Sequence, residues 1–322
     1  MRQRFSRTVR GLVLLAPFLI TASVQQGCSS GGYENARDKM AAASIIVSPD
    51  TLNGWLTQGY GTDSFGYDKL VVLEASSVAG YATEHIRGAI HVDAGTEVNV
   101  SRSDGIGGNY SYSYTDPVTS VTTRYADINA PAQVATREMM NAVIQRTGID
   151  RNTVVAIAGD SVMNAALLYF DFRYWGFPKE RLRVLDRSKG AWKAAGFPVT
   201  TDVPAAPAPS TYSVCNLPQN TSLRASLADM IRLADGQVPD AVAWDVREVG
   251  EYSGVAGSTA GPFAGKPGYA KKVAFEGHVR GAVNLEYWKM LSADKSTILD
   301  EATVRTAALA AGFGPGIRTH VY

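Results

Sequence analysis

The sequence predicts an α/β protein with parallel sheets covered by helices, and three observations lead to this fold class. Short apolar runs rich in β-branched residues alternate with segments whose apolar residues recur at helical spacing. A motif of eight residues occurs twice. The chain has 322 residues, of which 45% are hydrophobic and 19% are charged. Since roughly 100–200 residues make one domain, we expect two domains, each with its own core.

The first predicted elements follow from the residue pattern between positions 48 and 148. Ser48-Pro49-Asp50 predicts a helix start, because a serine caps free amides, proline fits the first turn and an early acid favours the helix dipole. Val71–Leu73 is short and apolar, as in strands buried on both faces. Apolar residues at helical spacing over Met139–Ile144 predict a further helix, which Gly148 ends.

The next elements continue this alternation. Val154–Ile157 predicts a strand, and the apolar residues over 167–175 predict the helix that follows it. Arg183–Leu185 predicts another strand, and a short helix begins at Ala191–Trp192 and closes at Gly196. Strands that alternate with helices imply a parallel sheet with helices on both faces.

An internal repeat organises the chain. Glu84–His91 reappears 193 residues later as Gly277–Asn284, with four of the eight positions identical. Upstream, a second pair of blocks matches at a separation of 171 residues, namely Leu70–Glu74 with Ala241–Asp245 and Tyr81 with Tyr252. Two matches in the same order indicate duplication, with an insertion between the blocks of the second copy.

The composition along the chain divides it into segments. Val203–Pro209 is rich in proline and alanine, which is typical of an extended, semi-rigid linker. We expect one domain over residues 45–202, the linker over 203–220 and a second domain over 221–322.

The first residues predict a targeting signal and a lipid anchor. An arginine-rich start precedes the apolar run Leu12–Val24, which is too short for a permanent membrane helix and typical of a secretory signal. Gly27-Cys28 resembles a bacterial lipobox, although Gln25 and Gln26 depart from its pattern. We expect a signal peptide over 1–27, lipidation of Cys28 and a polar tether over 28–44, hence a location in the cell envelope at the outer membrane, on its periplasmic or surface face. An ordinary signal peptide remains the alternative.

Charge and ligand residues exclude several classes of function. The net charge is +1, so no broad basic surface exists for a nucleic-acid partner. The chain has two cysteines and four scattered histidines, which cannot build a Cys₄ or Cys₂His₂ zinc site. We expect no metal and no cofactor.

The chain contains the motifs His85–His91, Asp245-x-Arg247-x-x-x-Glu251-Tyr252 and His278–Asn284 and the segment Val184–Pro198. Together these motifs resemble the tandem form of the rhodanese, or sulfurtransferase, family. The resemblance implies two rhodanese-like domains, each a parallel central sheet flanked by helices, the second incomplete. It also implies a cysteine that carries sulfur as a persulfide at the end of a strand, where backbone amides converge and stabilise the thiolate.

The resemblance locates the reactive loops. In the first copy the loop is degenerate, because Ala158 stands where the nucleophile would be and Asp160 would repel an anion. The loop comprises Ala158, Gly159, Asp160, Ser161, Val162 and Met163. In the second copy the corresponding strand is Thr319–Tyr322, and the cysteine is expected directly after Tyr322, outside this sequence. We expect a longer natural protein; a genuinely truncated, non-catalytic protein is the rival interpretation.

Two residues are candidates for substrate binding. Asp245 and Arg247 end a strand on the side where α/β sheets place ligands, and the resemblance suggests that Arg247 attracts an anion. An Asp–Arg pair that braces the turn is the alternative. Glu251 stands where some sulfurtransferases have a basic residue, and Cys215 is a poor nucleophile because its linker offers neither amides nor a base.

The resemblance implies a sulfurtransferase that moves sulfane sulfur from an anionic donor such as thiosulfate to a thiol or other thiophilic acceptor. The alternative from another class is a non-catalytic rhodanese-like lipoprotein that binds a partner, for example an envelope redox complex. A phosphatase with a related cysteine loop is a third possibility. Two insertions, 105–125 with several tyrosines and 253–275 with several lysines, are candidates for contact surfaces.

Overall fold

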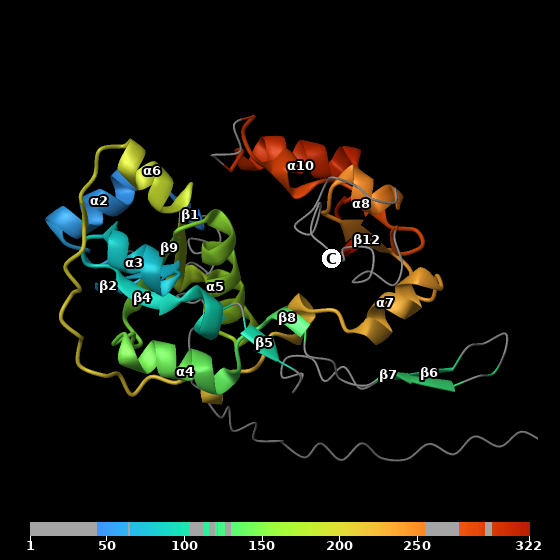
Figure 1. The fold of residues 1–322 in the computed structure, drawn as a ribbon, viewed down its shortest axis with the longest axis horizontal. Helices are drawn as coiled ribbons and strands as arrows, with labels where there is room; N and C mark the ends of the chain where they lie inside the picture. The colour runs from blue at the N-terminus through green and yellow to red at the C-terminus, as the bar shows by residue number, and fades with distance from the viewer. Residues whose placement is uncertain are drawn as a thin grey trace, which may run out of the picture.

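A computed structural model gives the structure of the chain. It describes residues 44–63, 65–98, 100–102, 112–115, 120, 122–125, 130–254, 277–293 and 298–322. The expectations for residues 1–43, including Cys28, and for most of both insertions lie outside these residues. The fold is α/β with parallel sheets flanked by helices, as the sequence predicted (Figure 1).

The larger sheet has five parallel strands in the order β1-β10-β9-β2-β4. The two central strands, β2 and β9, pair over seven residues. Every residue of β9 is buried, as expected for a parallel strand covered on both faces. The strands are β1 (Ile46–Val47), β2 (Lys69–Ser76), β4 (Ile90–Asp93), β9 (Thr153–Gly159) and β10 (Leu182–Leu185).

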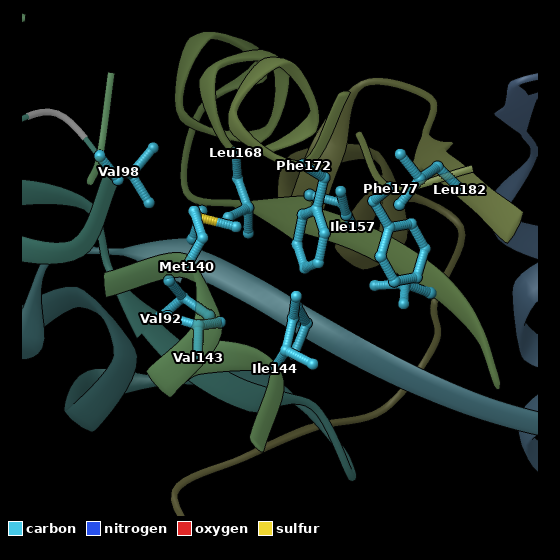
Figure 2. Close-up of a cluster of buried hydrophobic side chains, with 14 of the residues drawn as sticks. Val92, Val98, Met140, Val143, Ile144, Ile157, Leu168, Phe172, Phe177 and Leu182 are labelled. Atoms are coloured by element: carbon cyan, nitrogen blue, oxygen red, sulfur yellow. The ribbon is translucent and has the colours of Figure 1, made fainter. Parts of the chain in front are cut away.

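Two helices cover each face of this sheet. Helices α4 (Arg137–Arg146) and α5 (Val162–Tyr174) pack with the sheet residues that include Leu73 and Ile157. Figure 2 shows Leu168 and Phe172 of α5 in this cluster, beside Ile157 of β9.

Helices α2 (Pro49–Gln58) and α6 (Ser188–Ala194) cover the opposite face. There Leu52 of α2 and Trp192 of α6 pack with Val72, Ala156 and Ala158. The side chains of β2 and β9 thus alternate between two apolar clusters.

The predicted helix start at Ser48 is confirmed. Its hydroxyl accepts a hydrogen bond from the Thr51 amide at 3.1 Å, with Pro49 in the first helical turn. Thr136 and Ser161 cap α4 and α5 in the same way. A side-chain cap of this kind stabilises a helix by about 1 kcal/mol.

The second parallel sheet is small, with the order β13-β12-β14. Within the described residues β14 lies at the sheet edge, and Val321 in it is 55% exposed. The strands are β12 (Ala241–Asp245), β13 (Val283–Asn284) and β14 (Arg318–Val321). The helices are α7 (Leu227–Ala234), which begins with a Ser226–Asp229 capping box, α8 (Val249–Ser253) and α10 (Glu301–Ala310).

The later part of the expected linker, residues 212–217, packs on the larger sheet and its helices, which together are called the first unit below. Val214 is fully buried in the cluster formed by α4, α5 and the larger sheet. The Arg137 guanidinium of α4 donates to the Cys215 carbonyl at 3.0 Å and the Leu217 carbonyl at 3.2 Å. The extended segment expected as a linker therefore contributes to the core of the first unit.

Short elements complete the described chain. One helix is α3 (Val78–Thr83). The paired short strands are β3 (His85–Ile86) with β11 (Val199–Thr200), β5 (Val100–Arg102) with β8 (Ala130–Gln133), and β6 (Tyr112–Thr115) with β7 (Thr122–Tyr125). The helical turns are η1 (Ala94–Val98), η2 (Lys179–Arg181), η3 (Val214–Asn216), η4 (Thr221–Leu223) and η5 (Tyr287–Met290). Among the described helices, none has the length and apolar character needed to cross a membrane.

Candidate functional site

The repeated motif folds in the same way in both copies. The rings of Tyr81 and His85 stack with centroids 3.8 Å apart, and those of Tyr252 and His278 stack at 3.9 Å. In each copy the histidine Nδ1 faces the tyrosine carbonyl, at 2.9 Å and 2.8 Å. The tyrosine hydroxyl donates to the carbonyl of the alanine in the Gly-Ala pair, at 2.6 Å and 2.9 Å. In this structure both histidines brace their turns.

A fully buried carboxylate lies near the carboxyl end of β2 in the first copy and of β12 in the second. In the first copy this group is Glu74 of β2, whose Oε2 accepts a hydrogen bond from the Ile86 amide at 2.9 Å. Its Oε1 accepts one from Lys189 Nζ at 2.9 Å. The same ammonium donates to the Glu84 carbonyl at 2.7 Å, so Lys189 of α6 ties β2 to the repeated turn.

In the second copy Asp245 of β12 is the corresponding carboxylate, and Arg247 is its cation. Arg247 donates from Nε to Oδ1 at 2.9 Å and from a terminal nitrogen to Oδ2 at 2.5 Å. It also donates to the Gly277 carbonyl at 2.7 Å, the position that matches Glu84 in the repeat. In both copies a cation thus bonds to the buried carboxylate and to a carbonyl of the repeated turn. The cation comes from α6 in the first copy and from a residue just after β12 in the second.

These hydrogen bonds of Arg247 connect the end of β12 to the turn at Gly277. Burial alone would raise the pKa of Asp245, but the hydrogen bonds and charge of Arg247 outweigh it and hold that pKa below its ordinary value. The hydrogen bond to Asp245 likewise raises the pKa of Arg247. The Arg247 side chain is 34% exposed, so part of its charge remains accessible at the carboxyl edge of the sheet.

Tyr322 completes this cluster, a role that its place at a strand end did not indicate. Its hydroxyl accepts a hydrogen bond from the Val279 amide at 2.9 Å. Its backbone bonds to the Trp244 carbonyl at 3.0 Å and to the Val246 amide at 3.3 Å. The Arg247 guanidinium lies 5.5 Å from the centre of its ring. Burial raises the pKa of the Tyr322 phenol.

The strand register relates this cluster to the first copy. Ala158 of β9 lies opposite Glu74, and the backbone bonds of Tyr322 place it beside Asp245. By register, Tyr322 is therefore the counterpart of Ala158, and the position after Tyr322 is the counterpart of Gly159. The motifs alone align the expected cysteine with Ala158. The strand register aligns it with Gly159, one residue later.

The loop after β9 is closed by its own hydrogen bonds. The Gly159 amide donates to Ser188 Oγ at 2.7 Å, and that hydroxyl in turn donates to the Gly159 carbonyl. The Asp160 amide donates to the Ala75 carbonyl at 3.3 Å. A Cβ on Gly159 would lie 2.7 Å from the Ser161 carbonyl oxygen, so this tight turn requires glycine.

The rest of this loop carries no cationic and no thiol side chain. The Asp160 carboxylate accepts from the Ser77 amide at 3.3 Å and from Asn164 Nδ2 at 2.7 Å. Ser161 caps α5, Val162 begins that helix, and Met163 is exposed. The loop therefore presents a carboxylate and an apolar side chain.

The described residues give no support to a metal centre or to Cys215 as a nucleophile. They contain no group of three or more His, Cys, Asp or Glu side chains placed to hold a metal ion. Cys215 is exposed in the short turn η3. Its amide donates to Ser213 Oγ at 3.0 Å.

Comparison with known proteins supports this reading of the fold. No protein-family model matches the chain. The chain is 31% identical over 158 residues to the sulfur carrier protein TtuD of Thermus thermophilus, a match that covers 47% of this chain and 50% of that protein. The chain thus spans about half the length of this curated relative.

Solved structures with the same fold include the wild-type structure of EanB, with a TM-score of 0.59 and 19% identity. The match covers 86% of this chain and 59% of EanB. The anaerobic ergothioneine biosynthesis enzyme of Chlorobium limicola, in complex with its natural substrate trimethyl histidine, gives a TM-score of 0.59 at 19% identity, over 86% of this chain and 60% of that one. These likenesses establish the fold.

Proposed function

We propose that the protein transfers sulfur by the rhodanese mechanism, with a cysteine directly after Tyr322 as the nucleophile. The observation that carries this proposal is the meeting of Asp245, Arg247 and Tyr322 at the carboxyl ends of β12 and β14. Ligands of α/β proteins bind at this edge of the sheet. The similarity to a protein named as a sulfur carrier supports the same function.

The chemistry proceeds in two displacements. The cysteine thiolate attacks the sulfane sulfur of an anionic donor such as thiosulfate, and sulfite leaves with the electron pair of the broken S–S bond. The resulting persulfide is then attacked at its outer sulfur by an acceptor thiolate or cyanide, which releases the cysteine thiolate. The accessible part of the Arg247 charge favours the anionic donor and the thiolate.

A second candidate function is a binding or accessory role without catalysis. The loop after β9 favours this role for the first unit. The Gly159 amide already donates its hydrogen bond to Ser188, and the Asp160 carboxylate would repel an anion. We assign sulfur transfer to the second unit alone, which consists of the smaller sheet with α7, α8 and α10, and a supporting role to the first.

We also propose that the protein is held at the cell envelope by lipid on Cys28, facing the periplasm or the cell surface. The arginine-rich start and the short apolar run support this location. Its partners would be a small sulfur donor, a thiol acceptor and an envelope redox complex. Radiolabelled palmitate should enter the wild type and not Cys28→Ala; equal labelling would contradict the anchor.

Kinetics on the gene product with its natural sequence after Tyr322 tests the sulfur-transfer proposal. Thiocyanate formation from thiosulfate and cyanide should fall to background when the residue after Tyr322 is replaced by alanine. Cys215→Ser is the matched control, because it removes an exposed thiol away from the cluster, and it should keep full activity. A residue other than cysteine after Tyr322, or loss of activity in Cys215→Ser, would contradict the proposal.

A further inference from the structure

The two copies of the repeat satisfy one backbone amide in different ways. In the first copy the Ile86 amide donates directly to the Glu74 carboxylate at 2.9 Å. In the second copy the matching amide belongs to Val279, and it donates to the Tyr322 hydroxyl at 2.9 Å. Both carboxylates are fully buried. Because buried polar groups need hydrogen-bond partners, each copy must satisfy the amides and carbonyls around its carboxylate.

Side-chain length explains the difference. Asp245 is one methylene shorter than Glu74 and does not bond to the Val279 amide as Glu74 bonds to that of Ile86. The Tyr322 hydroxyl accepts the hydrogen bond of that amide instead, and this contact bridges the repeated turn and the end of β14. In the first copy the residue opposite Glu74 is Ala158, whose methyl group contributes no hydrogen bond. The pairs Glu74–Ala158 and Asp245–Tyr322 are thus alternative solutions to one packing problem.

The bridge also fixes the end of β14. Tyr322 is held at its hydroxyl by Val279, at its backbone by Trp244 and Val246, and its ring lies near the Arg247 guanidinium. These contacts fix the position of Tyr322 itself. We propose that Tyr322 is a positioning residue, whose hydroxyl couples the repeated turn to the strand end and thereby orients the group that follows. This role rests on the proposed sulfur transfer.

Three variants separate the parts of this bridge. Tyr322→Phe removes the hydroxyl alone, and Tyr322→Ala removes the ring as well. Asp245→Glu combined with Tyr322→Ala transplants the Glu74–Ala158 pair of the first copy. Tyr81→Phe is the matched control, because it deletes an equivalent tyrosine hydroxyl bond in the first unit, to the Ala89 carbonyl at 2.6 Å.

The experiment measures hydrogen exchange at the Val279 amide and thiosulfate kinetics on the gene product with its natural sequence after Tyr322. In Tyr322→Phe we expect exchange at Val279 to rise roughly fivefold, as for loss of one hydrogen bond. We expect kcat to fall roughly tenfold with KM nearly unchanged, because a small misplacement of a reacting group is costly. The transplanted pair should recover both values relative to Tyr322→Ala, and Tyr81→Phe should change neither.

Each other result decides against the inference. Unchanged exchange at Val279 in Tyr322→Phe would show that the hydroxyl does not hold that amide. Faster exchange with unchanged kcat, or an equal loss of kcat in Tyr81→Phe, would reduce Tyr322 to a general stabiliser. A wild type without thiosulfate activity would contradict the sulfur-transfer proposal itself, and the exchange data would still report whether the bridge exists.

Discussion

At the scale of single residues, the buried carboxylates are the main electrostatic feature of both units. Glu74 is fully buried, and Lys189, its ion-pair partner, is nearly so. A buried charge without a partner is much more costly than a hydrogen-bonded pair, because neither water nor an opposite charge then stabilises it. The pair therefore makes the first unit depend on one lysine of α6.

Replacing Lys189 by methionine should lower the free energy of unfolding by about 3 kcal/mol, since Glu74 would remain buried without its cation. Urea unfolding measures this change. Lys193→Met is the matched control on the same helix, because Lys193 pairs with Glu84 at the surface, and its effect should be much smaller. Equal effects of the two substitutions would show that the Glu74 pair has no special weight.

At the scale of elements, the turn between β9 and α5 packs tightly against neighbouring backbone atoms. Gly159 lies between the Ala75 and Ser161 carbonyls, and a Cβ there would approach these oxygens to 2.9 Å and 2.7 Å. Ser188, which seals the turn, and its neighbour Arg187 both have positive φ angles, near 59° and 56°. Residues other than glycine rarely adopt positive φ angles, so the surrounding contacts must hold the backbone of these two residues in this conformation.

Gly159→Ala should destabilise the protein by about 2 kcal/mol, because the backbone oxygens around it cannot move away as a flexible side chain can. Gly190→Ala provides the comparison: it lies in helix α6 with open space around its Cβ position and should be neutral or slightly stabilising. Thermal melting of both variants gives the measurement. Tolerance of Gly159→Ala would mean that the turn is looser than the structure shows.

Much of the element order was predictable from sequence, because it depends on local patterns. The Ser48 cap, the apolar runs of β2 and β9, and the helical spacing in α4 each follow from a few neighbouring residues. The partners of Glu74 and Asp245 were not predictable, because Lys189 and Tyr322 lie far along the chain. The clue to Tyr322 was the Glu-to-Asp change between copies, which acquires meaning only once the strand register is known.

At the scale of the whole molecule, the segment between the two sheets belongs to the fold of the first unit. Val214 is fully buried, and Arg137 binds two carbonyls of the same segment. A proline-rich segment without apolar periodicity gives no sign of this docking, and for that reason the sequence predicted a linker. The segment expected as a linker thus includes residues that pack into this core.

Val214→Ala should lower the free energy of unfolding by about 2 kcal/mol, through lost burial and the cavity it leaves. Val203→Ala, at the 74% exposed start of the same segment, should have almost no effect. Urea unfolding followed by tryptophan fluorescence distinguishes the two, since Trp175 lies in the same buried cluster as Val214. A neutral Val214→Ala would show that the segment is only loosely attached.

The most direct test of sulfur transfer is mass spectrometry of the gene product, with its natural sequence after Tyr322, treated with thiosulfate. We predict a mass increase of one sulfur atom that reducing agent removes, located by peptide mapping at the residue after Tyr322. An unmodified protein, or sulfur found on Cys215 instead, would contradict the assignment of the reaction to the edge formed by β12 and β14.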